Sequence, residues 1–425
     1  MKIICDRGAL LEAVNLMSAV VPARTPSPAL SCVKLVATKS HNLASLQISG
    51  TDGETALELN LSAVDVTTPG TAVVSADKVR QIIQSINDPT VTLELDGDTC
   101  HIKGSHAKFR VFAFNTADYP PLPPFNPSTG VANARAQFTH SAGALLRLIN
   151  RTMFATAKET SRYAINGVLL KRDGKKLEMV ATDGRRLALA RGAVKSAPNS
   201  PETGPVSCII PTKALNLFTR LSGDPDAPVR IALTDNRIFF AFDAQISPSA
   251  PAEPAAKKSK SKDSGGGTAV ATVEAPPAVS VQAPRAVLSS TLVEGAFPPY
   301  EDVIPKDQDK KATAAREDLI AAVRQASVLT NEESRGIRMT FTGKTKSVKL
   351  ASRAPEMGES EIDLALTNYE GEDLEICFNP HFISDVLKTL DEPEIVIEFK
   401  APNKPGVVRA GTDFTYVIMP VNLPS

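Results

Sequence analysis

The feature that most constrains the fold is a pattern of two helices and a strand that occurs three times along the 425 residues. Apolar residues at helical spacing begin near positions 8, 142 and 317, and a second such stretch begins near 75, 211 and 379. The two helices are thus about 67, 69 and 62 residues apart, and an apolar strand follows the second helix after about 16, 18 and 15 residues. Such matching intervals predict three copies of one α+β domain, with boundaries at 1–125, 126–308 and 309–425.

Residues 246–285 interrupt the second copy. They are built of Pro, Ala, Ser, Lys and Gly, with almost no large apolar side chain. Because such a composition cannot repay the entropy of ordering, we expect a disordered insert at a hairpin tip. Two interpretations of the insert remain open: a solvated spacer, or a basic tether that contacts DNA or a partner protein.

A stretch in the second copy, Ala181 to Ala190, combines an Asp-Gly pair with two arginines. Apolar residues precede and follow Asp183-Gly184, a pattern that indicates a tight hairpin. The first copy has a similar stretch, Thr51-Asp52-Gly53-Glu54, without the arginines. Folding alone therefore does not require Arg185 and Arg186, and a functional role is favoured for them.

Composition excludes several classes of protein. Lys+Arg and Asp+Glu both number 47, aromatic residues make up 5%, and Trp is absent, which argues against a base-stacking nucleic-acid binder. The five cysteines are widely spaced, as is typical of reduced thiols in the cytosol. Asp6 and Arg7 interrupt the short apolar start, and no apolar run approaches the roughly 18 residues of a membrane span. We therefore expect a soluble, cytoplasmic protein.

The two Asp-Gly turns are the candidate positions for catalytic carboxylates. Asp52 and Asp183 are conceivable ligands of a metal-dependent nuclease, but they lie in separate copies, and a turn-forming role is favoured. The five histidines lack metal-ligand spacing, and no Gly-rich phosphate loop occurs. We expect no catalytic residue, no metal and no cofactor. A nuclease and a peptide-binding scaffold that never encircles DNA remain the alternative hypotheses.

Several segments resemble the bacterial sliding clamp family, the β subunit of DNA polymerase III. They are the three repeats, Ala181–Ala188, Gly295–Tyr300, Asn331–Gly336 and Tyr416–Val421. The resemblance covers the chain except 246–285. It implies a non-catalytic processivity factor: a head-to-tail homodimer of three-domain chains that closes into a ring around duplex DNA, with helices lining the inner face and antiparallel sheets outside. The implied partners are the replicative polymerase α subunit, the clamp loader and repair polymerases, and the implied location is the nucleoid.

The resemblance and the helix positions also suggest site residues. The expected DNA-binding residues are Arg24, Lys78, Lys158, Arg162, Tyr163 and Lys213. A cleft for partner peptides with Leu and Phe anchors is implied at Ile165, Thr182, Gly184, Arg185, Arg186, Leu187, Pro298, Val303, Pro405, Val417, Ile418, Met419, Pro420, Val421 and Leu423. The sequence departs from the family pattern at Asp302, where a basic residue is common, and at Asn422.

The strand Phe109–Phe114 is a candidate for the dimer interface. An edge strand that carries Phe and Val needs a cover, which a second chain would provide. The expected interface residues are Phe109 and Val111 of one chain against Val328 and Leu329 of the other. From the sequence alone, an ordinary core strand is nearly as good an interpretation.

Overall fold

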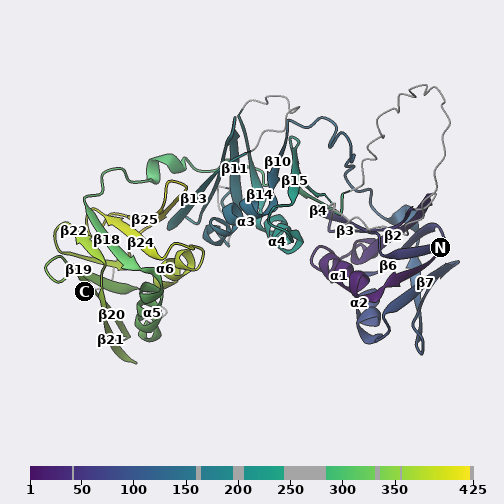
Figure 1. The fold of residues 1–425 in the computed structure, drawn as a ribbon, viewed down its shortest axis with the longest axis horizontal. Helices are drawn as coiled ribbons and strands as arrows, with labels where there is room; N and C mark the ends of the chain where they lie inside the picture. The colour runs from purple at the N-terminus through teal and green to yellow at the C-terminus, as the bar shows by residue number, and fades with distance from the viewer. Residues whose placement is uncertain are drawn as a thin grey trace, which may run out of the picture.

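Three α+β units follow one another in an arch, with the helices gathered along its concave side (Figure 1). A computed structural model describes residues 1–40, 43–158, 164–194, 205–243, 284–330, 336–354 and 357–421. In the part of the chain so described, no helix is long and apolar enough to cross a membrane.

Within the described residues, each unit holds two α-helices, and each of them follows a strand directly or after one residue. The helices are α1 (Arg7–Met17), α2 (Ala76–Ser85), α3 (Ala142–Asn150), α4 (Thr212–Leu221), α5 (Arg316–Ala326) and α6 (Pro380–Leu387). The strands that lead into them are β1 (Lys2–Asp6), β6 (Gly70–Ser75), β10 (Ala136–Ser141), β14 (Val206–Pro211), β18 (Lys310–Ala315) and β23 (Leu374–Phe378). The strand–helix element thus occurs twice within every repeat that the sequence predicts. The helix spacings alone did not indicate this twofold repetition inside each unit.

The helix starts are capped in different ways. Ser75 stands at the N-cap of α2, as the sequence predicts, but its side chain makes no capping hydrogen bond. At α1, by contrast, the Asp6 carboxylate accepts from the Ala9 amide at 2.8 Å.

The strands form three sheets. The first, of 13 strands, has the order β10-β15-β16-β17-β4-β3-β2-β6-β9-β8-β7-β1-β5. Its strands not yet given are β2 (Cys32–Ser40), β3 (Leu43–Thr51), β4 (Thr55–Leu61), β5 (Val64–Thr68), β7 (Thr90–Asp96), β8 (Thr99–Lys103), β9 (Lys108–Phe114), β15 (Pro228–Leu233), β16 (Arg237–Phe242) and β17 (Ala286–Thr291).

The second sheet, of 9 strands, has the order β14-β11-β12-β13-β26-β25-β24-β18-β22, and the third is β21-β20-β19-β23. Their remaining strands are β11 (Gly167–Asp173), β12 (Lys176–Thr182), β13 (Arg186–Ala193), β19 (Ile337–Thr342), β20 (Ser347–Ala354), β21 (Gly358–Ala365), β22 (Asn368–Glu370), β24 (Glu394–Phe399), β25 (Gly406–Ala410) and β26 (Phe414–Ile418).

Two antiparallel strand pairs connect the units into continuous sheets. Strand β17 of the middle unit pairs with β4 of the first, with Leu288 opposite Leu57. Strand β13 of the middle unit pairs with β26 of the last, with Leu187 opposite Val417. Each unit is therefore joined to the next by backbone hydrogen bonds between strands.

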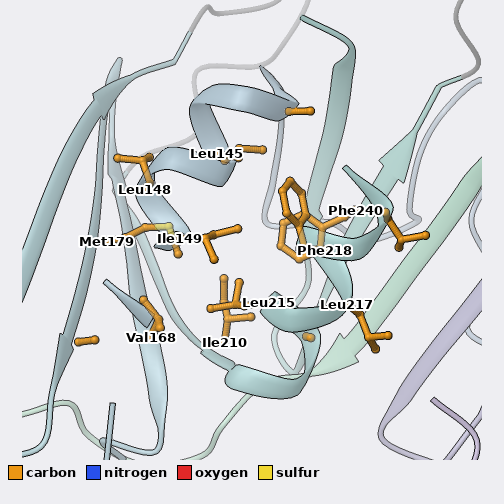
Figure 2. Packing of buried hydrophobic residues seen from close by; sticks show 14 of the residues in the cluster. Leu145, Leu148, Ile149, Val168, Met179, Ile210, Leu215, Leu217, Phe218 and Phe240 are labelled. Atoms are coloured by element: carbon orange, nitrogen blue, oxygen red, sulfur yellow. The ribbon is translucent and has the colours of Figure 1, made fainter. Parts of the chain in front are cut away.

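The middle unit shows how the helices are fixed to the sheets. Leu145 and Ile149 of α3 lie beside Leu215 and Phe218 of α4 above the sheet residues (Figure 2). The rings of Phe218 and Phe240 meet edge to face at 5.1 Å between centroids. Burial of each such side chain stabilises the fold by roughly 1.5–3 kcal/mol, so the amphipathic pattern by itself selects which helix face turns inward.

The predicted insert lies outside the described residues from 246 to 283, but its last two residues are part of the fold. Arg285 donates to the Leu221 carbonyl at 2.7 Å, and Asn60 donates to the Pro284 carbonyl at 2.8 Å. The prediction of disorder is therefore wrong for Pro284 and Arg285. Asn60 belongs to β4, so these two residues contact the first unit.

Candidate partner-binding cleft and ring surfaces

The two Asp-Gly turns have the same local structure. Asp183 Oδ1 accepts from the amides of Arg185 and Arg186 at 2.9 and 3.0 Å, and Gly184 has φ +83°. In the first unit, Asp52 Oδ1 accepts from the two amides that follow Gly53 at 2.9 and 2.6 Å, and Gly53 has φ +98°. A positive φ favours glycine, and the Asp carboxylate satisfies the turn amides, so the turn prediction is confirmed at both places.

Arg186 joins the middle unit to the last one. Its side chain is 9% exposed and donates to Asp183 at 3.0 Å, to Asp385 of α6 at 2.7 Å and to the Phe154 carbonyl at 2.8 Å. The guanidinium also lies 4.4 Å from the centroid of the Phe382 ring. Burial by itself would lower the pKa of Arg186, but the hydrogen bond to Asp385 and the Asp183 charge raise it overall.

The sequence places both arginines at the rim of a cleft, and the structure separates their roles. Arg185 is exposed, whereas the guanidinium of Arg186 is engaged in the contact between units. Of these two arginines, Arg185 is thus the one whose charge can meet a ligand at the rim.

An apolar cleft of about 370 Å³ lies beside the β13–β26 pair. It is lined by Ile165, Thr182, Gly184, Arg185, Arg186, Leu187, Pro298, Tyr300, Val303, Val417 and Met419. Leu187 and Val417 are buried, while Val303 and Met419 are 47% and 39% exposed. The amide of Met419 donates to the Arg185 carbonyl at 2.9 Å, which fixes the chain after β26 against the turn.

Ten of the residues expected in a peptide cleft line this one, and others lie elsewhere. Ile418 is 2% exposed and faces the core on the other side of β26, because successive residues of a strand point to opposite faces. Pro405, Pro420 and Val421 are half-buried outside the lining, and Leu423 lies outside the described residues.

Tyr300 lines the cleft although the sequence did not select it. Its hydroxyl donates to Glu178 at 3.3 Å, and its ring meets Phe297 at 6.2 Å between centroids. Burial, with the charges of Glu178 and Glu301, raises the pKa of Tyr300, so the hydroxyl stays protonated and donating. The sequence does contain a signal for this position, the Phe297-Pro298-Pro299-Tyr300 motif. A Tyr next to apolar residues is often buried with its hydroxyl bonded to a polar partner.

The residues expected to bind DNA have different surroundings. Arg24, Lys78 and Lys158 are exposed, and Lys78 is next to the Asp77–Arg80 ion pair. The expected contacts Arg162 and Tyr163 lie outside the described residues.

Lys213 is engaged within the chain. Its ammonium binds the Asp52 carboxylate and donates to the Val20 carbonyl at 3.1 Å, so it joins the first two units. Burial alone would raise the pKa of Asp52. The hydrogen bonds from Lys213 and from the turn amides have a larger effect in the opposite direction, so the pKa lies below its ordinary value.

We expect Lys213→Ala to lower the free energy of unfolding by about 1 kcal/mol or less, since both partners are partly exposed. A carboxyl whose pKa falls on folding stabilises the fold above its unfolded pKa of about 3.9, and this contribution is lost as the pH drops through the lowered value. Urea unfolding at pH 7 should therefore separate wild type from variant, and the gap should shrink below about pH 4. Lys78→Ala is the matched control; a gap that persists in acid would contradict the ion-pair explanation.

The two ends of the arch expose strand edges. Strand β9 pairs with β8 along Lys108–Phe112 but with β6 only at Ala113 and Phe114, so most of its other edge is open. At the opposite end, β21 is the terminal strand of its sheet.

The side chains of β9 alternate between half-buried and exposed, so the interface prediction named the residues of the less exposed face. Phe109 and Val111 are half-buried and pack against the core, whereas Phe112 is 79% exposed and Phe114 40%. Val328 is 72% exposed, and the Leu329 carbonyl accepts from Ser352 of β20 at 3.2 Å. The exposed face of β9 thus carries Phe112 and Phe114 beside the charged Lys108 and Arg110, and the interface role of Phe109 and Val111 stays a prediction.

Among the described residues, no group of three or more His, Cys, Asp or Glu is placed to hold a metal ion.

The features described so far define a class of protein, a ring-forming DNA clamp. They are an arch of three similar units, helices on its concave side, an open strand at each end and a peptide-sized apolar cleft.

Comparisons with known proteins give the particular family. Three family models match this chain in order. The DNA polymerase III beta subunit N-terminal domain matches residues 1–123, the central domain matches 141–250 and the C-terminal domain matches 301–422. The chain belongs to this family of bacterial sliding clamps.

Individual relatives agree over their whole lengths. The beta sliding clamp of Pseudomonas putida is 29% identical over 98% of this chain and 99% of the relative, and that of Escherichia coli K12 is 26% identical over all of both. The crystal structure of the DNA polymerase III subunit beta from Pseudomonas aeruginosa matches all of both chains with a TM-score of 0.80 at 27% identity. A sliding clamp from the same species bound to griselimycin matches with a TM-score of 0.81.

These findings confirm the resemblance drawn from the sequence. The protein is a DNA sliding clamp, the non-catalytic processivity factor of the replicative polymerase, and its family forms a homodimeric ring around duplex DNA. DNA, the polymerase and the clamp loader are its partners.

Proposed function

We propose that the cleft beside the β13–β26 pair is the site where partner proteins insert a short extended peptide with Leu and Phe anchors. The observation that carries this is the pairing of a rigid apolar floor, Leu187 and Val417, with the exposed, adaptable Met419. A Met side chain repacks readily around different anchors, which suits a site that serves several partners. Arg185, whose guanidinium is exposed, adds a donor for a peptide carbonyl or carboxylate.

For the inner face, we propose that Arg24, Lys78 and Lys158 make weak phosphate contacts. All three are exposed, and phosphate contacts of this kind carry no sequence information. Lys213 contributes little, since Asp52 holds its ammonium. The expected contacts Arg162 and Tyr163 remain part of this proposal.

We propose further that the ring closes where the open edge of β9 meets β21 of a second chain, with Phe112 near the partner's Val328 and Leu329. Unpaired edges and exposed apolar side chains at both ends support this. The domain limits proposed are 1–125, 126–308 and 309–425, with the nucleoid in the cytoplasm as the location.

The cleft is tested by Met419→Ala. Truncating this side chain is expected to weaken a labelled Leu/Phe peptide at least tenfold, because interface anchors contribute about 1–2 kcal/mol or more each. Fluorescence anisotropy measures the affinity, and thermal unfolding checks the fold. Met357→Ala is the matched control, since Met357 is 63% exposed and lies outside the cleft. Unchanged affinity in Met419→Ala, or an equal loss in Met357→Ala, would remove the cleft from consideration.

A further inference from the structure

A second groove, of about 720 Å³, lies on the same outer face of the nine-stranded sheet as the cleft. Its apolar lining includes Leu169, Ile209, Leu292, Val293 and Phe297. Nothing in the family's clamp function described above uses it.

The segment 293–304 lies between the two hollows. Its Phe297, Tyr300 and Ile304 pack on the sheet in one cluster that also contains Leu187 of the cleft and Ile209 of the groove. Pro298 and Tyr300 line both hollows. The groove and the cleft therefore share one wall, and an extended chain that leaves the cleft reaches the groove by crossing this segment.

The groove lies along the β14 edge of the sheet, with Ser207, Cys208 and Ile209 in its lining. Strand β14 is the terminal strand of the sheet, and on its outer side the Ile209 carbonyl accepts from the Val293 amide at 2.9 Å. This bond fixes the start of the segment 293–304 to the edge of the sheet, where the segment forms one wall of the groove.

The charges around the groove are unbalanced. Arg135 pairs with Asp235 at 3.5 Å, and Lys171 pairs with Glu301 at 3.2 Å. The two remaining acids of the lining, Glu294 and Asp302, are exposed and have no cationic partner within the described residues. The unpaired charge of the groove is therefore negative.

We propose that this groove receives a basic flank of the same partner peptide whose apolar anchors occupy the cleft. The inference rests on the proposed function of the cleft and adds a preference: lysine or arginine beyond the anchors, facing Glu294 and Asp302. Exposed charge pairs of this kind select partners and speed association more than they tighten binding.

The sheet sets the length of the connection. Strands β13 and β14 are separated by β12 and β11, which is three strand spacings or about 14 Å. An extended chain covers about 3.3 Å per residue, so roughly four to five residues separate anchors at β13 from a lysine at the β14 side of the groove. Glu294 lies on that side, next to Val293, whereas Asp302 adjoins Val303 of the cleft and is nearer to the anchors.

The test compares labelled peptides on the full chain by fluorescence anisotropy. One carries only the Leu/Phe anchors, and the others add, at either end, a four-residue Gly/Ser spacer and two lysines or two glutamates. We expect lysines at one end to tighten binding about 3- to 10-fold in low salt, glutamates to give no gain, and 0.5 M salt to remove most of the gain.

The double variant Glu294→Gln/Asp302→Asn should lose the lysine gain and bind the anchor peptide as before. The matched control is Asp318→Asn/Glu372→Gln, which changes the net charge equally at exposed acids outside the groove. A lysine gain that survives in the first variant, equal loss in both variants, or no gain at either end would overturn the basic-flank proposal. If the anchor peptide itself fails to bind, the proposed function of the cleft fails instead.

Discussion

Loaded onto closed circular DNA, this clamp is expected to stay bound in high salt and to leave once the circle is cut. Its 47 basic and 47 acidic residues give no net charge, and the exposed cations expected to face DNA are few. Contacts to phosphate weaken steeply as salt rises, whereas retention by a closed ring does not depend on salt. Gel filtration of labelled clamp on circular and linearised plasmid in 0.5–1 M salt measures the difference, which should exceed about tenfold.

Linear DNA with bulky proteins bound at both ends provides the control, because blocked ends should restore retention. Equal retention on open linear and circular DNA would contradict encirclement. Loss from both at high salt would mean that binding is electrostatic.

The variant Arg186→Ala is expected to lose about 2–3 kcal/mol of stability, because it removes charged hydrogen bonds to the partly exposed Asp183 and Asp385 carboxylates. The neighbouring Arg185 gives a matched control: it is exposed, and Arg185→Ala should change stability by less than about 0.5 kcal/mol. Urea unfolding measures both. Similar losses in the two variants would show that the contact between units does not depend on Arg186.

The peptide affinity of the same variants separates structure from recognition. Arg185→Ala should weaken anchor-peptide binding without changing the fold, whereas Arg186→Ala should act through the disturbed contact between β13 and α6. Restored stability in Arg186→Lys would be partial at best, since lysine cannot reproduce the forked donor geometry.

Repetition made most of the fold predictable from the sequence. Helical spacing and apolar alternation are local signals, and three matching intervals placed the six helices within a few residues of where they occur. The Asp-Gly turns followed from residue chemistry alone, since Asp183 and Gly184 satisfy a turn in any surroundings.

What escaped prediction depends on contacts between distant residues. Arg186 meets Asp385, which is 199 positions away in the sequence, and Lys213 meets Asp52, which is 161 away. No spacing rule marks such pairs. The direction of Ile418 and the exposure of Phe112 were in principle readable from strand alternation, but only once the strand register was known.

The strand pairs that connect the units also determine where a ring of two such chains can open. Within each chain, both junctions are crossed by backbone hydrogen bonds of a continuous sheet and reinforced by Lys213 or Arg186. Bending a chain at a junction would distort several backbone hydrogen bonds of the sheet together, so we expect the junctions to resist opening. At the boundaries between chains no linking segment holds the two sides together, so we expect a ring of two such chains to open there when DNA enters.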